Sequence, residues 1–191
     1  MQNSLPQESH ALQIGAVRRD LPLFAVSPDL AIAVLNILGD TELCEAAADA
    51  LAKDLATHEY VALVTAEAKS IPLAYALSLR VKKPYVVLRK NYKSYMGEAL
   101  QTSTLSITTG RPQTLYLDAK DRSLLQGQPV VLVDDVISTG STLEAMRSLM
   151  GEAQAQIAAV ATICTEGDMP PQLPEPLLAL AHLPLFPLQA S

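Results

Sequence analysis

The chain has 191 residues, of which 49% are hydrophobic and 18% charged, and its formal net charge is −6. This length suits one compact domain with a full core, and the composition is that of a globular protein, not a disordered one. The negative charge argues against a nucleic-acid-binding surface, and no apolar run approaches the ~20 residues that a membrane span needs.

The N-terminal part combines short apolar runs with prolines. Residues 12–17 and 21–26 are predicted as short strands, because Pro22 and Pro28 break any helix. The first residues lack the charged and apolar regions of a signal peptide, so we expect a cytoplasmic protein. The run 31–38 either covers a pocket or fills the core. After it, Asp40 or Thr41 is a good N-cap for a helix that ends near residue 58.

Two buried strands follow, each ending in charged residues. Residues 60–65 have the length and apolar content of a buried strand and lead into Ala66-Glu67-Ala68-Lys69-Ser70-Ile71-Pro72 and a second helix pattern. Residues 84–88 form the next predicted strand, which ends in Arg89-Lys90. We expect the loop at 66–72 to close the same edge of the sheet as the stretch 130–142, described below.

Residues 91–117 have a different pattern. Residues 105–108 and 113–117 alternate apolar and polar side chains, which is typical of half-exposed strands, and Gly110-Arg111-Pro112 between them predicts a turn. Residues 91–104 contain Tyr92, Lys93 and Tyr95 without such a pattern. The segment therefore predicts a mobile loop and an antiparallel hairpin that stands off the sheet.

The stretch from Val130 to Thr142 concentrates the chemistry. The run Val130-Val131-Leu132-Val133 predicts a strand buried on both faces, and Asp134 and Asp135 follow where open α/β sheets bind ligands. The turn at residues 138–142 then offers backbone N–H groups and hydroxyls at the start of a helix, which suits phosphate. Carboxylates suit hydroxyl groups or positive charge instead. Together these features predict a site for a sugar phosphate.

Other interpretations of this stretch are weaker. A P-loop needs a Lys after its second Gly, and no Lys follows Gly140; the dinucleotide pattern Gly-x-Gly-x-x-Gly occurs nowhere in the chain. A plain strand–helix corner with a solvated acidic edge would not need the hydroxyl-rich turn.

The C-terminal third completes the fold prediction. Apolar residues from Leu143 to Met150 share one helix face, and residues 157–164 form another buried strand. Cys44 and Cys164 lie far apart in apolar segments and are expected to be buried thiols. Residues 177–188 form either a last strand or an apolar flap. Strands and helices alternate, so we predict one α/β domain over residues 1–191 with a doubly wound, mainly parallel sheet.

The stretch 130–142 resembles the phosphoribosyl pyrophosphate (PRPP) motif of type I phosphoribosyltransferases, in which two acids and Thr-Gly-Ser/Gly-Thr follow an apolar strand. The loop at 66–72 is similar to the pyrophosphate loop of the purine enzymes, where adenine enzymes carry Glu-Ala-Arg-Gly-Phe; here Lys69 and Ser70 replace Arg and Gly. Residues 91–117 are similar to the family's flexible loop. The resemblance covers about residues 40–168. It implies a homodimer and a small hood, built from about residues 1–40, the C-terminal segment or both.

The resemblance also implies a reaction, in which a purine base displaces pyrophosphate from PRPP to give a nucleoside 5′-monophosphate. Asp134 and Asp135 would be catalytic, binding the ribose hydroxyls and steadying positive charge on the ring. The Mg²⁺ cofactor would arrive with PRPP and not on a protein cage. The implied 5′-phosphate ligands are Ser138, Thr139, Gly140, Ser141 and Thr142. The implied pyrophosphate ligands are Ala68, Lys69, Arg89, Lys90 and Lys93.

The acceptor base is less constrained. The loop at 67–69 and the Arg89-Lys90 pair favour the purine enzymes, with adenine first and xanthine-type enzymes next. Base-binding candidates are Asn36, Ile37, Leu38 and Glu166, for which ordinary packing or capping is an equal alternative. A second hypothesis is a PRPP-binding regulator without transfer activity. We expect the enzyme, because such a regulator should add a DNA-binding domain and a basic surface.

Overall fold

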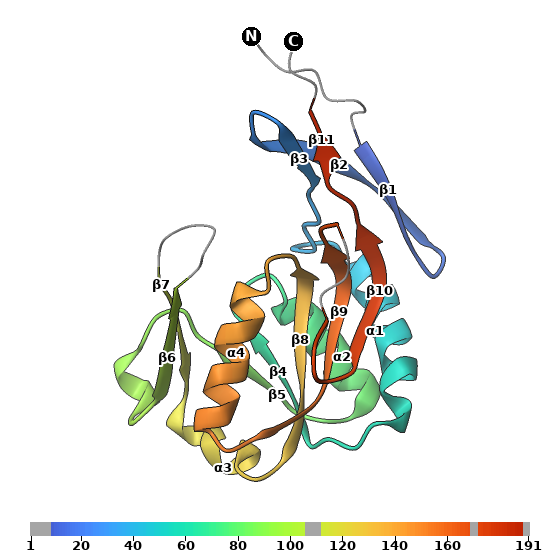
Figure 1. The fold of residues 1–191 in the computed structure, drawn as a ribbon. Helices are drawn as coiled ribbons and strands as arrows, with labels where there is room; N and C mark the ends of the chain where they lie inside the picture. The colour runs from blue at the N-terminus through green and yellow to red at the C-terminus, as the bar shows by residue number, and fades with distance from the viewer. Residues whose placement is uncertain (1–8, 106–111, 169–171, 189–191) are drawn as a thin grey trace.

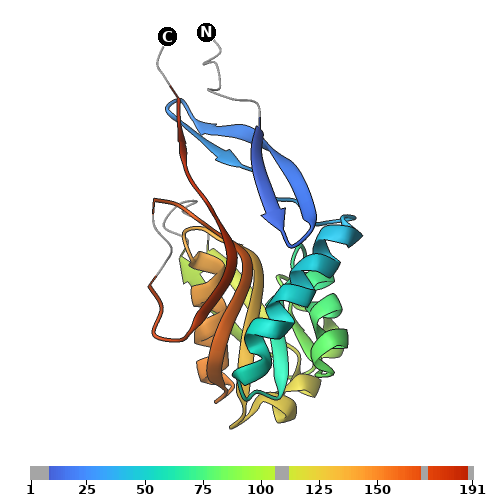
Figure 2. The same ribbon diagram turned by 90° about the vertical axis from the view of Figure 1, so that its right-hand side faces the viewer.

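The structure is a computed structural model that describes residues 9–105, 112–168 and 172–188. Its centre is a five-stranded sheet of order β10-β9-β8-β4-β5 in which all neighbours are parallel. These strands are β4 (Ala62–Ala66), β5 (Tyr85–Leu88), β8 (Pro129–Ile137), β9 (Gln156–Glu166) and β10 (Leu177–Leu183). Helices α1 (Thr41–Asp54) and α2 (Ile71–Val81) cover one face, and α4 (Ser141–Glu152) covers the other (Figures 1 and 2). The predicted doubly wound sheet is confirmed.

The central strands are apolar on both faces because helices cover both faces. Alternate residues of β8 pack in opposite directions: Val131 and Val133 belong to the core cluster under α1 and α2, whereas Leu132 belongs to the cluster under α4. Shorter helical segments complete the layers, namely 3₁₀ turns η1 (Leu55–Thr57), η2 (Ser94–Met96) and η3 (Ala119–Asp121), and helix α3 (Arg122–Leu125). Within the described ranges, no helix is long and apolar enough to cross a membrane.

A second, smaller sheet lies beyond the carboxyl edge of the central one (Figures 1 and 2). It contains β1 (Ser9–Ile14), β2 (Val17–Ser27), β3 (Leu30–Ala33) and β11 (Phe186–Pro187), all antiparallel. The predicted strand 12–17 was wrong, because a hairpin turn with Gly15 at φ +57° divides it. The C-terminal segment serves both sheets: β10 extends the central sheet, and β11 joins the small one.

The predicted hairpin forms as a two-stranded sheet of its own, outside the central sheet, and it packs against α4. Strands β6 (Leu100–Leu105) and β7 (Pro112–Leu117) pair antiparallel and pack beside α4 (Figure 1), where the Thr102 and Ser148 hydroxyls are 3.0 Å apart. Leu115 and Leu117 are fully buried. The first strand of the hairpin was predicted at 105–108. Residues 106–111, with most of the predicted turn, lie outside the described residues.

Asp40 attaches the small sheet to the first helix. Its carboxylate accepts hydrogen bonds from Arg19 of β2 at 2.7 and 2.8 Å, and it also accepts from the Leu43 backbone N–H at 3.1 Å as the N-cap of α1. The hydrogen bonds from Arg19 lower the pKa of Asp40 below its usual value. One side chain thus caps a helix and anchors the small sheet.

We predict that Asp40→Ala lowers the free energy of unfolding by about 1–2 kcal/mol, because the variant loses a helix cap and leaves Arg19 without its bidentate partner. Urea unfolding followed by circular dichroism measures the change. Asp54→Ala is the matched control, since Asp54 is exposed at the other end of α1 and its side chain makes no capping bond. Equal stability of the two variants would contradict the assigned role of Asp40.

Candidate active site

The two acids lie within β8 and not after it. The strand continues to Ile137 because the long neighbouring strand β9 still pairs with it, Asp134 opposite Thr162 and Ile137 opposite Thr165. The predicted strand end at Val133 was therefore wrong. Asp135 is buried with 6% exposure, and Asp134 is partly buried. Buried carboxylates need partners, and here the partners come from another strand's loop.

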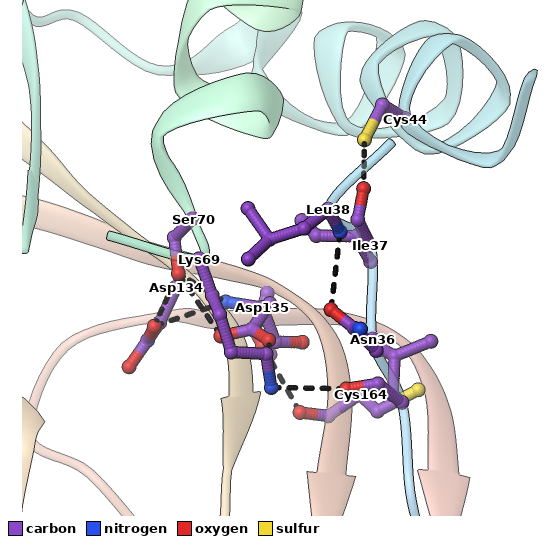
Figure 3. A network of polar contacts seen from close by, with 11 residues as sticks. Asn36, Ile37, Leu38, Cys44, Lys69, Ser70, Asp134, Asp135 and Cys164 are labelled. Carbon is purple, nitrogen blue, oxygen red and sulfur yellow. Dashed lines mark hydrogen bonds and ion pairs between the residues drawn. The ribbon is translucent and has the colours of Figure 1, made fainter. Parts of the chain in front are cut away.

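Lys69 and Ser70 supply those partners (Figure 3). The Ser70 hydroxyl lies 2.6 Å from Asp134 Oδ1 and 3.0 Å from Asp135 Oδ1, and the Lys69 ammonium lies 2.8 Å from Asp135 Oδ2. Lys69 also donates to the Leu35 carbonyl at 2.9 Å. Burial, ahead of repulsion from Asp135, raises the pKa of Asp134 to about 6. The ammonium group places a positive charge beside the Asp135 carboxylate.

The loop before α2 is held in place through Glu67. The Glu67–Ala68 peptide is cis, and the Glu67 carboxylate accepts from Arg89 Nε and from the Lys90 backbone N–H, both at 2.5 Å. These contacts with Arg89 and Lys90 lower the pKa of Glu67, although its burial acts in the opposite direction. The ends of β4 and β5 are therefore joined across the edge of the sheet.

The turn after β8, at residues 138–142, is the segment predicted as a phosphate cradle. It lines a hollow of about 110 Å³ together with residues of β8, and Gly140 has φ +75°, a conformation that favours glycine. Because the N-cap of α4 is a glycine, no side chain caps the first turn of this helix. The start of α4 points the positive end of its dipole into the hollow.

This cradle adjoins a second hollow of about 150 Å³, which is lined by the loop at 66–70, Lys90 and the acid pair. Asp134, Val136 and Thr142 line both hollows. The hydroxyl-rich turn at the start of α4, two carboxylates and two lysines therefore meet along one continuous surface. Such a surface can hold a ligand with phosphate at one end and hydroxyl groups in the middle.

The other predicted residues are less central. Arg89 turns toward Glu67 and the Tyr95 hydroxyl, and Lys93 is exposed; neither lines the two hollows. Ala68, Lys69 and Lys90 do line the second hollow.

The base-binding candidates differ in exposure: two are exposed and two are buried. Asn36 and Leu38 are exposed between β3 and α1, where the Leu38 N–H donates to the Asn36 side chain at 3.2 Å, but the Ile37 side chain is fully buried in the core. Glu166 is 8% exposed at the end of β9 and lines neither hollow.

Three groups that make contacts at the site were not predicted from the sequence: the Glu67 carboxylate, the Ser70 hydroxyl and the Leu35 carbonyl. Glu67 was not among the predicted site residues, although an acid near the basic Arg89-Lys90 pair at the same sheet edge is a signal for it. Ser70 was noted only for its difference from glycine, and that difference was the available signal. The Leu35 carbonyl carries no sequence signal at all.

A metal cage is not formed by the described residues: no three or more His, Cys, Asp or Glu side chains lie close enough together to hold an ion. The acids at the hollow instead bind Ser70 and Lys69. This donor set fits a metal that arrives already bound to a polyanionic ligand.

Comparison with known proteins adds family and fold. Residues 35–173 match the phosphoribosyl transferase domain family. The chain is 29% identical over 148 residues to the purine biosynthesis transcriptional repressor PurR of Bacillus subtilis, covering 78% of this chain and 51% of the repressor. It is 36% identical over 106 residues to the hypoxanthine/guanine phosphoribosyltransferase of Methanocaldococcus vulcanius, covering 56% of this chain and 54% of that protein. The chain thus spans about half the length of these curated relatives.

Two solved structures have the same fold. Giardia lamblia adenine phosphoribosyltransferase, solved with 9-deazaadenine, matches with a TM-score of 0.70 at 18% identity. The match covers 85% of this chain and 93% of the Giardia chain. The adenine phosphoribosyltransferase of Thermoanaerobacter pseudethanolicus has a TM-score of 0.66 at 18% identity, over 92% and 95% of the two chains. With a family match that spans most of its length, this chain belongs to the phosphoribosyl transferase domain family.

Proposed function

We propose that this protein transfers the phosphoribosyl group of PRPP to a purine base and releases pyrophosphate. The observation that carries the proposal is the pair of adjoining hollows with Asp134 in their common wall. In the proposed complex, the turn at 138–142 binds the 5′-phosphate, and the acid pair binds the ribose hydroxyls. The loop at 66–70 and Lys90 then face the pyrophosphate.

The acid pair suits the chemistry of this transfer. As the bond from C1 to pyrophosphate breaks, positive charge develops on the ribose ring, and a nearby carboxylate that is ionised stabilises it. The Asp135 carboxylate forms an ion pair with Lys69 at 2.8 Å. Departing pyrophosphate is met by the positive charges of Lys69 and Lys90, and Mg²⁺ bound to PRPP would neutralise more of its charge.

We propose adenine as the acceptor, because the loop at 67–69 resembles the adenine enzymes. Hypoxanthine and guanine are the rival acceptors, since several curated relatives at 36–37% identity are named for them. We further propose that the small sheet is a hood over the base, with Asn36 and Leu38 at its inner end, in a single-domain protein that forms a homodimer. A cytoplasmic location stays a prediction from the sequence.

A second candidate function is that of a PRPP-responsive regulator. The similarity to the Bacillus subtilis repressor supports it, because that match covers 78% of this chain, against 56% for the Methanocaldococcus enzyme. Such a protein would bind PRPP and need no acceptor base. Turnover separates the two functions.

The first test mixes the protein with PRPP, Mg²⁺ and each of adenine, guanine, hypoxanthine and xanthine, and follows pyrophosphate release. We expect turnover with adenine, and a loss of at least about 100-fold in kcat/KM for the Asp134→Asn, Asp135→Asn double variant, which keeps the shape of the site but loses its charge. Turnover with another purine would replace adenine as the acceptor. PRPP binding without turnover would support the regulator and overturn the transferase.

A second test uses pH. Because Asp134 is protonated below about pH 6, we expect kcat/KM for PRPP to fall more steeply below that pH in the natural protein than in Asp134→Asn. Ionisation of PRPP affects both proteins equally, so the difference between them isolates Asp134.

Stability should change in the opposite direction. Burial raises the folded pKa of Asp134 above its unfolded value, so the folded protein binds this proton more tightly. The free energy of unfolding should therefore fall, through this group, as pH rises from about 4 to about 6. Asp134→Asn should be more stable than the natural protein at pH 7.5, by on the order of 1–2 kcal/mol, and the gain should shrink at pH 5. Urea unfolding at the two pH values measures it, and an equal difference at both would refute the assignment.

A further inference from the structure

Ser70 has an unusual use for a residue at the start of a helix. It is the N-cap of α2, where a serine normally accepts from a backbone N–H of the first turn, yet its side chain makes no capping bond. The side chain turns instead toward β8, and the residue is only 2% exposed (Figure 3). The Ser70 hydroxyl therefore binds the acid pair and does not cap its own helix.

The Ser70 hydroxyl makes its contacts with three atoms of the acid pair. It accepts from the Asp135 backbone N–H at 3.0 Å and lies 2.6 Å from Asp134 Oδ1 and 3.0 Å from Asp135 Oδ1. A serine has a single proton to donate, and the shorter contact assigns it to Asp134. Asp135 takes its charge partner from Lys69. The two carboxylates thus have different partners, Ser70 for Asp134 and Lys69 for Asp135, although both lie beside the same hydroxyl.

The position of this hydroxyl between the two acids bears on how their side chains are oriented. Successive side chains of a strand point to opposite faces, so two neighbouring acids would diverge. Here the Ser70 hydroxyl donates to Asp134 Oδ1 and accepts from the Asp135 backbone N–H, so it holds the Asp134 side chain at the side of the strand where Asp135 Oδ1 also lies, 3.0 Å from the same oxygen. A glycine at position 70, as in the adenine-enzyme loop, offers no such atom.

We propose that Ser70 is a positioning residue, whose hydroxyl holds the Asp134 carboxylate and the Asp135 main chain in the arrangement that binds the ribose hydroxyls of PRPP. This inference rests on the proposed function for its ligand but not on the transfer step. Ser70 borders the same hollow as the acids, but it is only 2% exposed and its hydroxyl is bonded to them, so we expect it to act through them. Its loss leaves the Asp135 N–H paired, because that group also donates to Asp134 Oδ1 at 3.0 Å, so the variant is expected to fold.

The test measures PRPP binding by calorimetry in the presence of Mg²⁺ and without a base. Ser70→Ala should weaken PRPP binding about 10- to 100-fold, the range expected when a hydrogen bond to a charged group is lost. Ser70→Thr keeps the hydroxyl and should recover most of the affinity. Ser78→Ala is the matched control, since Ser78 lies on the same helix, is partly exposed, and its hydroxyl donates to the Tyr75 carbonyl at 2.8 Å. It should bind PRPP like the natural protein.

Kinetics then separates positioning from simple loss of structure. In Ser70→Ala, KM for PRPP should rise while KM for the base stays constant; a partly unfolded variant would instead lose kcat with both KM values unchanged. Ser70→Gly provides a second variant that removes the hydroxyl without adding a methyl group, and it should behave like Ser70→Ala.

The outcomes are distinct. Normal PRPP affinity in both Ser70→Ala and Ser70→Gly would overturn the positioning role, whether or not transfer occurs. Weakened PRPP binding in these variants, in a protein that turns over no base, would support the positioning role and reject only the transferase. A natural protein that does not bind PRPP would overturn both proposals.

Discussion

The constraint on which the site depends is the burial of two adjacent carboxylates inside a parallel strand. A buried carboxylate without partners is unstable by several kcal/mol, and neighbouring like charges add to the cost. The chain meets this constraint with one hydroxyl, one ammonium and one backbone N–H, which come from the start of α2, the loop before it and β8 itself. Because β4 pairs directly with β8, the loop after β4 lies where these partners are needed.

The two acids are consequently unequal. Asp135 faces an ammonium, whereas Asp134 is bound only by uncharged donors, and its burial moves its pKa toward neutrality. A charged Asp134 costs stability in the folded chain, and the proposed reaction uses that same charge. Sites that stabilise a developing cation commonly keep such an unfavourable charge, which is why removing it should stabilise the protein and impair its proposed activity together.

Prediction from the sequence succeeded where a local pattern decides the structure. The apolar runs predicted the central strands, the capping candidates Asp40 and Thr41 predicted the start of α1, and the motif at 130–142 predicted a strand, an acid pair and a turn into a helix. Prediction failed where contacts with a segment far away in the sequence decide the structure. The strand β8 extends past Val133 because β9 is long, the hairpin packs on α4 because Leu115 and Leu117 need cover, and β11 joins a sheet made by the other end of the chain.

Lys69 shows why a residue's type can be predicted more readily than its contacts. Its charge and its place in the loop were visible in the sequence, but its partners lie 66 positions later, at Asp135, and 34 positions earlier, at Leu35. Through these two contacts the acid pair is joined to the segment that carries Asn36 and Leu38. A ligand that draws Lys69 toward its own negative charge must compete with both contacts. Changes at the acid pair and changes in the segment leading to the small sheet are therefore coupled through a single ammonium group.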